Sequence, residues 1–229
     1  MNEQKIIVVG ANSDLISPFR EKASGCGYKL MNLTRKEWDL ANPNIPERIS
    51  RKIVDFKPNH ILYAAGLNEI LDFEEAHSNS ILMTINQHLN VNCLSFLNLV
   101  VLLREQLTYS LTSVHGISSL YGIYGRSTRL PYSLSKHALE GAIKCLALEM
   151  PKTLVLGYRP GFFETKLTHK NISKVNQNKI MNRIPKGRFG KPEELSDIIL
   201  NNITQPPMYC SGSFITMDGA LTAGGIFST

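Results

Sequence analysis

Short runs of β-branched and aliphatic residues alternate along this chain with longer segments of helical period, and no other feature constrains the fold as strongly. The strand-like runs lie at 5–10, 28–33, 60–66, 110–117, 153–161 and 211–219. Helices are predicted at 14–26, 46–55, within 74–107, at 131–149 and at 192–203. Such alternation is typical of a parallel sheet with right-handed crossovers. We therefore predict the α/β class, as a single-domain Rossmann-type doubly wound parallel sheet of about seven strands with helices on both faces.

The length of 229 residues fits one domain, and no repeat or linker divides the chain. The N-terminal segment lacks the basic and apolar regions of an export signal, and the most apolar helical run, 89–103, is too short and too polar to span a bilayer. The four cysteines lie far apart, and the six histidines show no metal-binding spacing. We expect a cytoplasmic protein with no membrane contact and no metal site.

The net charge of +6 is concentrated in one segment. Residues 166–191 contain eight basic side chains and no acidic one, so the remainder of the chain is net negative by two. This segment lies in the one long irregular stretch, and a long loop in a compact domain is often a lid or binding loop. Solvated lysines that need no ligand are the alternative explanation. Nucleic acid is disfavoured, because the chain lacks interleaved aromatic residues and any recognition motif.

The first strand-like run ends in a turn of small and polar residues that leads directly into a helix. The turn includes Gly10, Asn12, Ser13, Asp14 and Leu15. Backbone N–H groups at the start of a helix, together with the positive end of its dipole, can hold a pyrophosphate. Only one glycine is present where the strong form of this motif has three. An ordinary turn capped by Ser13 or Asp14 therefore stays open as an alternative.

Tyr132 and Lys136 are four residues apart at the start of a predicted helix, which places them on one helix face. A cation about 4 Å from a phenol contributes on the order of 4 kcal/mol at an effective dielectric near 20, roughly three pKa units. Lys136 is thus expected to bring Tyr132 towards the range of acid/base catalysis. Ser119, at the end of a predicted strand, has a hydroxyl suited to orient a substrate oxygen. The alternatives are a solvated helix face and a simple turn serine.

A series of motifs spread over nearly the whole chain resembles, in content and in order, the short-chain dehydrogenase/reductase family, classical type. They are GANSDL at 10–15, AAG at 64–66, Asn90 in LNVNCLSF, Ser119, YSLSK at 132–136 and PGFFET at 160–165. The tail, RIPKGRFGKPEEL followed by GSFITMDGA, resembles that of 3-oxoacyl-carrier-protein reductases. The resemblance implies that residues 1–229 form one dinucleotide-binding and catalytic domain, with 162–191 as a basic substrate lid.

The resemblance also implies roles for individual residues. Tyr132 would exchange a proton with the substrate oxygen, Lys136 would lower its pKa and hold the nicotinamide ribose, and Ser119 would steady the reacting oxygen. Asn90 would anchor a water that relays protons to Lys136. Further cofactor contacts are implied for Asp39, Leu40, Ala64, Ala65, Gly66, Pro160, Gly161, Phe163 and Thr165.

Two positions depart from the family pattern, because Asp14 and Ile16 stand where glycine is usual. Ile16 is the greater change, because the glycine that is usual at this position allows close packing of helix on strand. Arg35 follows the second strand, where no acid is present at the strand end, and an arginine there can accommodate the 2′-phosphate of NADP. We therefore favour NADP(H) over NAD(H).

These features predict a hydride transfer between nicotinamide and a ketone or secondary alcohol. The substrate would be a small carbonyl compound, and the basic lid favours an anionic one, linked to an acyl carrier, coenzyme A or a nucleotide. A sugar-nucleotide oxidoreductase or epimerase is one alternative, and a cofactor-sensing protein without turnover is another. The resemblance implies that the long helix near 90–107 and the helix that carries Tyr132 pack against their copies, so we expect a homotetramer or dimer. Core packing is the alternative explanation of the apolar run in the first of these helices.

Overall fold

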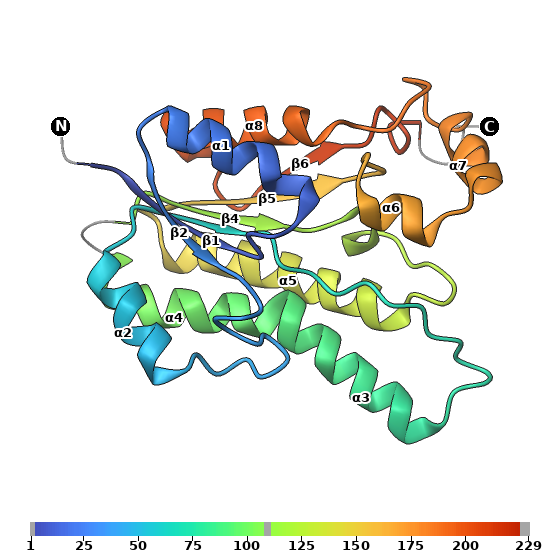
Figure 1. Cartoon of the computed structure of the whole chain (residues 1–229), viewed down its shortest axis with the longest axis horizontal. Helices are drawn as coiled ribbons and strands as arrows, with labels where there is room; N and C mark the ends of the chain where they lie inside the picture. Colours follow the sequence, from blue (N-terminus) through green and yellow to red (C-terminus); the bar gives the residue numbers. More distant parts are fainter. Residues whose placement is uncertain (1–2, 108–110, 225–229) are drawn as a thin grey trace.

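Six parallel strands form one sheet in the order β2-β1-β3-β4-β5-β6. Their bounds are β1 (Lys5–Val9), β2 (Lys29–Leu33), β3 (His60–Tyr63), β4 (Ser113–Ile117), β5 (Leu154–Pro160) and β6 (Phe214–Met217). Figure 1 shows the computed structural model, which describes residues 3–107 and 111–224. The chain first builds outward from β1 to β2 and then returns to the other side of β1 with β3. Such a switch in direction leaves a crevice at the carboxyl ends of the two strands, where ligands bind in open α/β sheets.

The predicted fold class is confirmed, but the predicted count of about seven strands is wrong for the described part of the chain, which has six. Each of the six strand-like runs of the sequence forms one of these strands, so the seventh strand of the predicted count has no run of its own. The start of the run predicted at 110–117 includes residue 110, which lies outside the described residues.

Helices cover both faces of the sheet (Figure 1). On one face lie α1 (Ser17–Gly25) and α8 (Pro192–Thr204), and on the other lie α2 (Glu47–Phe56), α4 (Ser95–Leu107) and α5 (Leu130–Glu149), with α3 (Ser78–Leu89) packed along α5. One apolar core fills each interface, with Phe19 and Ile199 on the first side and Phe96 and Ile143 on the second. Strands buried on both faces explain why their sequences are apolar without alternation. Within the described ranges, no helix has the length and apolarity needed to cross a bilayer.

The long helix predicted within 74–107 is interrupted. A π-helical segment, Asn90–Leu94, separates α3 from α4 and changes which side chains face the sheet. Such single-turn bulges occur often at functional sites. Within this one, Asn92 is completely buried.

The basic segment predicted as irregular contains two short helices, α6 (Lys166–Asn171) and α7 (Lys174–Met181). Each begins at a side-chain cap: the Thr165 hydroxyl accepts from the Thr168 N–H at 3.2 Å, and the Ser173 hydroxyl accepts from the Asn176 N–H at 3.4 Å. Both helices lie at the same end of the molecule, beyond the arrowheads of the central strands (Figure 1).

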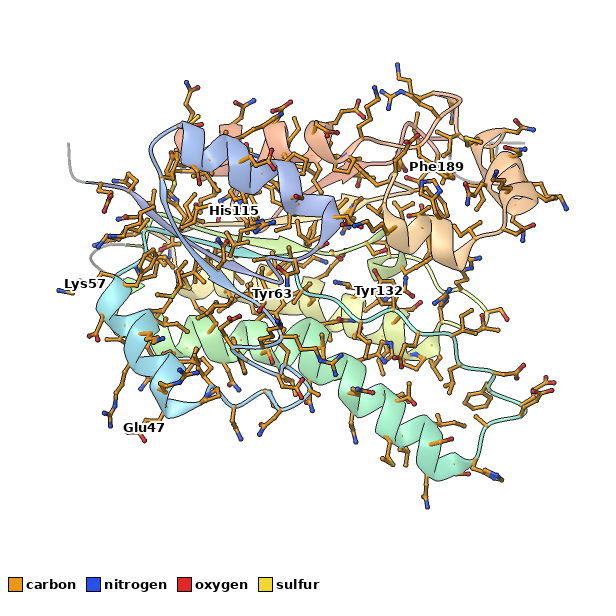
Figure 2. The ribbon with its side chains drawn as sticks, in the orientation of Figure 1. Glu47, Lys57, Tyr63, His115, Tyr132 and Phe189 are labelled. Atoms are coloured by element: carbon orange, nitrogen blue, oxygen red, sulfur yellow. The ribbon has the colours of Figure 1, made fainter. Side chains whose placement is uncertain are left out.

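A chain of buried polar side chains crosses three adjacent strands. The Ser113 hydroxyl lies 2.8 Å from His60 Nδ1 and 2.7 Å from His115 Nε2, and His115 Nδ1 lies 2.9 Å from the Tyr158 hydroxyl. Burial lowers the pKa of His60 to about 4 and that of His115 to about 3. Both rings are therefore neutral at physiological pH. His115 lies in the interior of the molecule (Figure 2).

Candidate active site

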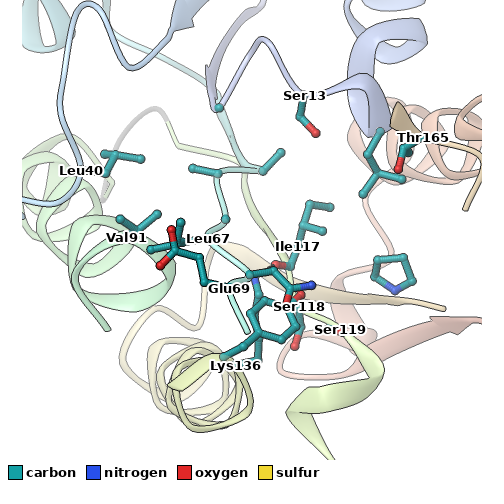
Figure 3. A pocket seen from close by; sticks show the side chains of 18 of the residues that line it. Ser13, Leu40, Leu67, Glu69, Val91, Ile117, Ser118, Ser119, Lys136 and Thr165 are labelled. Carbon is teal, nitrogen blue, oxygen red and sulfur yellow. Dashed lines mark hydrogen bonds between the residues drawn. The ribbon is translucent and has the colours of Figure 1, made fainter. Parts of the chain in front are cut away.

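A cavity of about 680 Å³ opens at the carboxyl edge of the sheet. Figure 3 shows Ser13 and Thr165 on one side of it and Leu40 and Val91 on another, and Ser119 and Lys136 also line it. Nearly every predicted site residue lines this cavity: Gly10, Asn12, Ser13, Asp14, Leu15, Arg35, Asp39, Leu40, Ala64, Ala65, Gly66, Ser119, Tyr132, Lys136, Pro160, Gly161, Phe163 and Thr165. The exception is Asn90. The parallel sheet brings these distant segments together because all its strands end at one edge.

The turn after β1 is pressed against the end of β3. Gly10 has a φ of +79°, and a Cβ at this position would lie 2.5 Å from the backbone nitrogen of Ala65. Only glycine fits here, on both conformational and steric grounds. The turn is also tied to the end of β2, because the Gly10 N–H donates to the Leu33 carbonyl at 2.9 Å.

The chain accommodates Ile16 by starting its helix late. A single 3₁₀ turn, Asp14–Ile16, precedes α1, which begins at Ser17 and not near residue 14 as predicted. The Ile16 side chain is fully buried in the apolar core beside α8. The expected conflict between helix and strand is therefore avoided, and Pro18 fits the first turn of α1, where no intrahelical N–H bond is lost.

Asp14 connects the turn to the basic segment 166–191. Its carboxylate accepts from the Lys166 backbone N–H at 3.3 Å and lies 3.6 Å from Lys166 Nζ. The charge of Asp14, one of the two departures from the family pattern, is thus paired with a cation of that segment.

Lys136 is held deep in the site by the backbone. It is 3% exposed, and its ammonium donates to the Ile117 carbonyl at 2.8 Å. The ammonium lies 5.7 Å from the centre of the Tyr132 ring. Burial lowers the pKa of Lys136 to about 8.

The Tyr132 phenol keeps its proton more firmly than predicted. Burial raises its pKa and outweighs the opposing hydrogen bond with Ser119. Desolvation has the largest effect on the pKa of both groups, raising that of Tyr132 and lowering that of Lys136. A phenol that stays protonated and shares a hydrogen bond with a serine is a proton donor.

The structure corrects the choice of asparagine. Asn90 does not line the cavity, and its amide donates to the Ala41 carbonyl at 2.8 Å. Asn92 instead accepts from the Leu67 N–H at 2.7 Å and donates to the Ser135 hydroxyl at 2.7 Å. Asn92 Oδ1 and Lys136 Nζ each lie 3.7 Å from the point that a Cβ on Gly66 would occupy.

The reason for this error is the π-helical segment, which regular helical periodicity cannot reveal. Asn90, the predicted residue, and Asn92 lie two positions apart, and the break in the helix turns Asn92 towards the loop that follows β3. The sequence offered no other signal for Asn92.

At the far end of the cavity, Arg35 is paired. Its Nε lies 3.8 Å from Asp39 Oδ1, and both side chains are mostly exposed. The Glu37 carboxylate accepts a hydrogen bond from the Thr34 N–H at 2.8 Å. Trp38, which sequence analysis missed, is buried and lines the cavity beside these residues.

Three further lining residues near Tyr132 were missed, namely Tyr121, Arg126 and Arg129. The rings of Tyr121 and Tyr132 meet edge to face, with centres 6.0 Å apart. Of the described side chains in 166–191, only Thr168 and Ile172 line the cavity, and no basic one does. The described charges of the basic segment 166–191 therefore lie outside the cavity lining. No cluster of metal-ligating side chains occurs among the residues that the structure describes.

The sheet order, the turn at Gly10 and the tyrosine–lysine pair together define a nucleotide-binding α/β protein of the Rossmann type. The family model described as "Enoyl-(Acyl carrier protein) reductase" matches residues 60–222. The chain belongs to the short-chain dehydrogenase/reductase family.

Among curated proteins, the chain is similar to two 3-oxoacyl-[acyl-carrier-protein] reductases over part of their length. The Thermotoga maritima protein is 38% identical over 111 residues, which cover 48% of this chain and 45% of that protein. The Aquifex aeolicus protein is 33% identical over 121 residues, covering 52% and 48%. The matched stretch thus spans about half the length of these relatives. A third such reductase, from Buchnera aphidicola subsp. Baizongia pistaciae, is 26% identical over 96% of this chain and 88% of its own.

Solved structures share the fold over almost the whole chain. A 4-hydroxyisoleucine dehydrogenase complexed with NADH has a TM-score of 0.85 at 21% identity, covering 97% of this chain and 100% of that one. ElxO with NADP bound has a TM-score of 0.84 at 18% identity, covering 96% and 99%. At these identities the likeness concerns the fold.

Proposed function

We propose that this chain is a nicotinamide-dependent oxidoreductase that interconverts a ketone and a secondary alcohol, with Tyr132 as general acid/base. One observation carries the proposal. Ser119, Tyr132 and the buried Lys136 line the same cavity as the glycine turn after β1. A second, smaller cavity beside Asp14 and Pro192 has neither a phosphate-type glycine turn nor a tyrosine–lysine pair in its lining.

The residues present fit a dinucleotide. The tight turn at Gly10 leaves backbone N–H groups for phosphates, and Ala64–Gly66 offers small side chains beside it. The segment from Pro160 to Thr165 would line the nicotinamide end, next to Lys136. A nicotinamide dinucleotide bound there would supply or accept the hydride.

The side chains of this chain handle the proton and the oxygen. In ketone reduction, the Tyr132 hydroxyl donates its proton to the carbonyl oxygen while the Ser119 hydroxyl holds that oxygen. The Lys136 ammonium stabilises the phenolate left on Tyr132. Asn92 is a positioning residue, because its amide ties Leu67 to Ser135 and so fixes the loop that follows β3 against α5.

NADP(H) is the preferred cofactor in this proposal. Arg35 lines the cavity at the end of β2, where its guanidinium can meet a 2′-phosphate. Asp39 is its present partner, and it would have to release Arg35 or share it. Structural neighbours with NADH and with NADP show that this fold carries either dinucleotide.

The substrate in this proposal is a small carbonyl compound, and residues 162–191 act as its lid. The curated relatives are named for acyl-carrier-protein substrates, which supports an acyl-type ketone. The protein would act in the cytoplasm as a homotetramer or dimer.

Fluorescence titration with NADPH and NADH, followed by turnover of a ketone panel, tests the proposal. The Tyr132→Phe variant should bind NADPH as the wild type does and lose about 10²- to 10⁴-fold in kcat. Tyr124→Phe is the matched control, because Tyr124 is exposed and does not line the cavity, and it should keep full activity. Binding of neither dinucleotide would overturn the proposal, and tight binding with no turnover of any ketone would favour a sensor.

A further inference from the structure

Two arginines face the cavity beside Tyr132 without an acidic partner. Arg126 and Arg129 both line it, and neither makes an ion pair among the residues that the structure describes. A guanidinium in such a position normally pairs with a carboxylate or a phosphate, because its fork of N–H donors fits the oxygens of these groups.

Arg129 is the more constrained of the two. It is 8% exposed, and its Nη1 donates to the Asn68 carbonyl at 3.2 Å and to Asn68 Oδ1 at 2.8 Å. Both acceptors are neutral, and its Nε and Nη2 have no partner among the described residues. Burying a cation without a counter-charge is costly, so a chain that retains one beside a cavity suggests an anion supplied from outside.

Arg126 extends this positive surface towards solvent. It donates to the Tyr121 hydroxyl, and its guanidinium carbon lies 5.6 Å from the centre of the Tyr121 ring. Tyr121 in turn meets Tyr132 edge to face. The three side chains form a continuous wall from the solvent to the proposed acid/base.

Acidic groups of the cavity lining do not cancel this charge. Asp14 and Asp39 are paired with Lys166 and Arg35, respectively, near the dinucleotide end. Glu69 is exposed and does not pair with either arginine of the wall. The substrate end is therefore electropositive.

We infer that the substrate carries its own carboxylate close to the reacting carbon, so that this site, if the proposed function holds, interconverts an oxo acid and a hydroxy acid. The carboxylate would lie against Arg129 and Arg126. In reduction, the ketone carbon gains a hydride from the reduced nicotinamide and the ketone oxygen gains the Tyr132 proton. The carboxylate is unchanged, and the nicotinamide is left oxidised.

Turnover of matched acids and esters tests the inference. The substrates are 2-oxobutanoate and 3-oxobutanoate with their methyl esters, and the variants are Arg126→Gln and Arg129→Gln. Wild type should prefer one acid over its ester by tenfold or more in kcat/KM. We expect Arg129→Gln to lose about 100-fold and Arg126→Gln about tenfold on the acid, at about 1.4 kcal/mol per tenfold, with less than a threefold change on the ester. Arg48→Gln, an exposed change on α2, should alter neither.

A binding measurement separates this inference from the proposed function. Calorimetry would compare butanoate with butanamide, which differ in charge and cannot react, with and without NADPH. Wild type should bind butanoate at least tenfold more tightly, and Arg126→Gln, whose only described partner is Tyr121, should remove that preference without unfolding.

Equal binding of butanoate and butanamide, or an equal loss of both in Arg126→Gln and Arg129→Gln, would overturn the inference. A retained preference for butanoate in a protein that neither binds NADPH nor turns over ketones would overturn the proposed function and leave the anion site standing. The two failures are therefore distinguishable.

Discussion

Burial governs the chemistry of the two central residues. Lys136 has its pKa lowered from its ordinary 10.5 to about 8, so it is charged at neutral pH and loses its proton as the pH rises through about 8. Ketone reduction depends on that charge to stabilise the Tyr132 phenolate. We therefore expect kcat/KM for reduction to be level below about pH 7 and to fall above about pH 8, measured as initial rates of NADPH oxidation. A profile that stays level to pH 10 would contradict the role given to Lys136.

Asp14 places a negative charge where phosphates would bind. One charge about 6 Å from another contributes about 0.7 kcal/mol in water, equivalent to about threefold in affinity. The Asp14→Asn variant keeps an acceptor for the Lys166 N–H and should bind NADPH about threefold more tightly by fluorescence titration. Asp55→Asn, an exposed change on α2, is the control. Weaker binding in Asp14→Asn would show that the Asp14–Lys166 contact matters more than the charge.

At this scale the sequence revealed Ser119, Tyr132 and Lys136 because their spacing reflects one strand end and one helix turn. It did not reveal Asn92, because the direction of that side chain depends on a π-helical segment. It did not reveal Arg129 either, because nothing in the local sequence distinguishes this arginine from an ordinary polar residue before a helix. Their surroundings come from distant segments, Leu67 and Asn68, and local patterns carry no information about those contacts.

The buried hydrogen-bonded network that contains His60 and His115 makes the packing of β3, β4 and β5 sensitive to acid. Both His60 and His115 have folded-state pKa values lowered by burial, to about 4 and about 3. Their contribution to stability is fully present above about pH 6.5, the pKa of histidine in the unfolded chain, and is lost as the pH falls. In that range the unfolded chain binds protons at both histidines and the folded protein does not. Each histidine contributes a slope of about 1.4 kcal/mol per pH unit between about 6 and 4.

Urea unfolding from pH 7 to pH 5 measures that slope. We expect His115→Leu to have a shallower dependence on pH than wild type, by about 1.4 kcal/mol per unit, whatever its absolute stability. His77→Gln, in which an exposed imidazole is removed, should leave the slope unchanged. Parallel pH profiles for wild type and His115→Leu would refute the assignment.

Strands and most helices could be predicted because apolar runs and helical periods are local signals. The elements that were missed depend on tertiary context. Ile16 delays α1 because its side chain enters the core, and α6 and α7 begin at hydroxyl caps in a polar segment. The predicted count of about seven strands exceeded the six strand-like runs of the sequence, each of which forms one strand.

For the whole molecule, apolar side chains remain exposed on α4 and α5. Val101 is 51% exposed and Leu148 81% exposed. Such surface is typical of an interface between subunits, and core packing does not account for it. We expect light scattering to give the mass of a tetramer or dimer for wild type and a smaller species for Val101→Glu. Wild type that is monomeric at high concentration would refute the predicted assembly.

The central claim is that the Tyr132 hydroxyl delivers its proton beside a nicotinamide held in this cavity. A crystal structure with bound NADP⁺ tests it most directly. We predict that the phosphates lie on the Gly10 turn and the nicotinamide lies by Pro160–Thr165, with the Tyr132 and Ser119 hydroxyls facing one open position next to the ring. A dinucleotide bound elsewhere, or a Tyr132 hydroxyl turned away from the nicotinamide, would contradict the account.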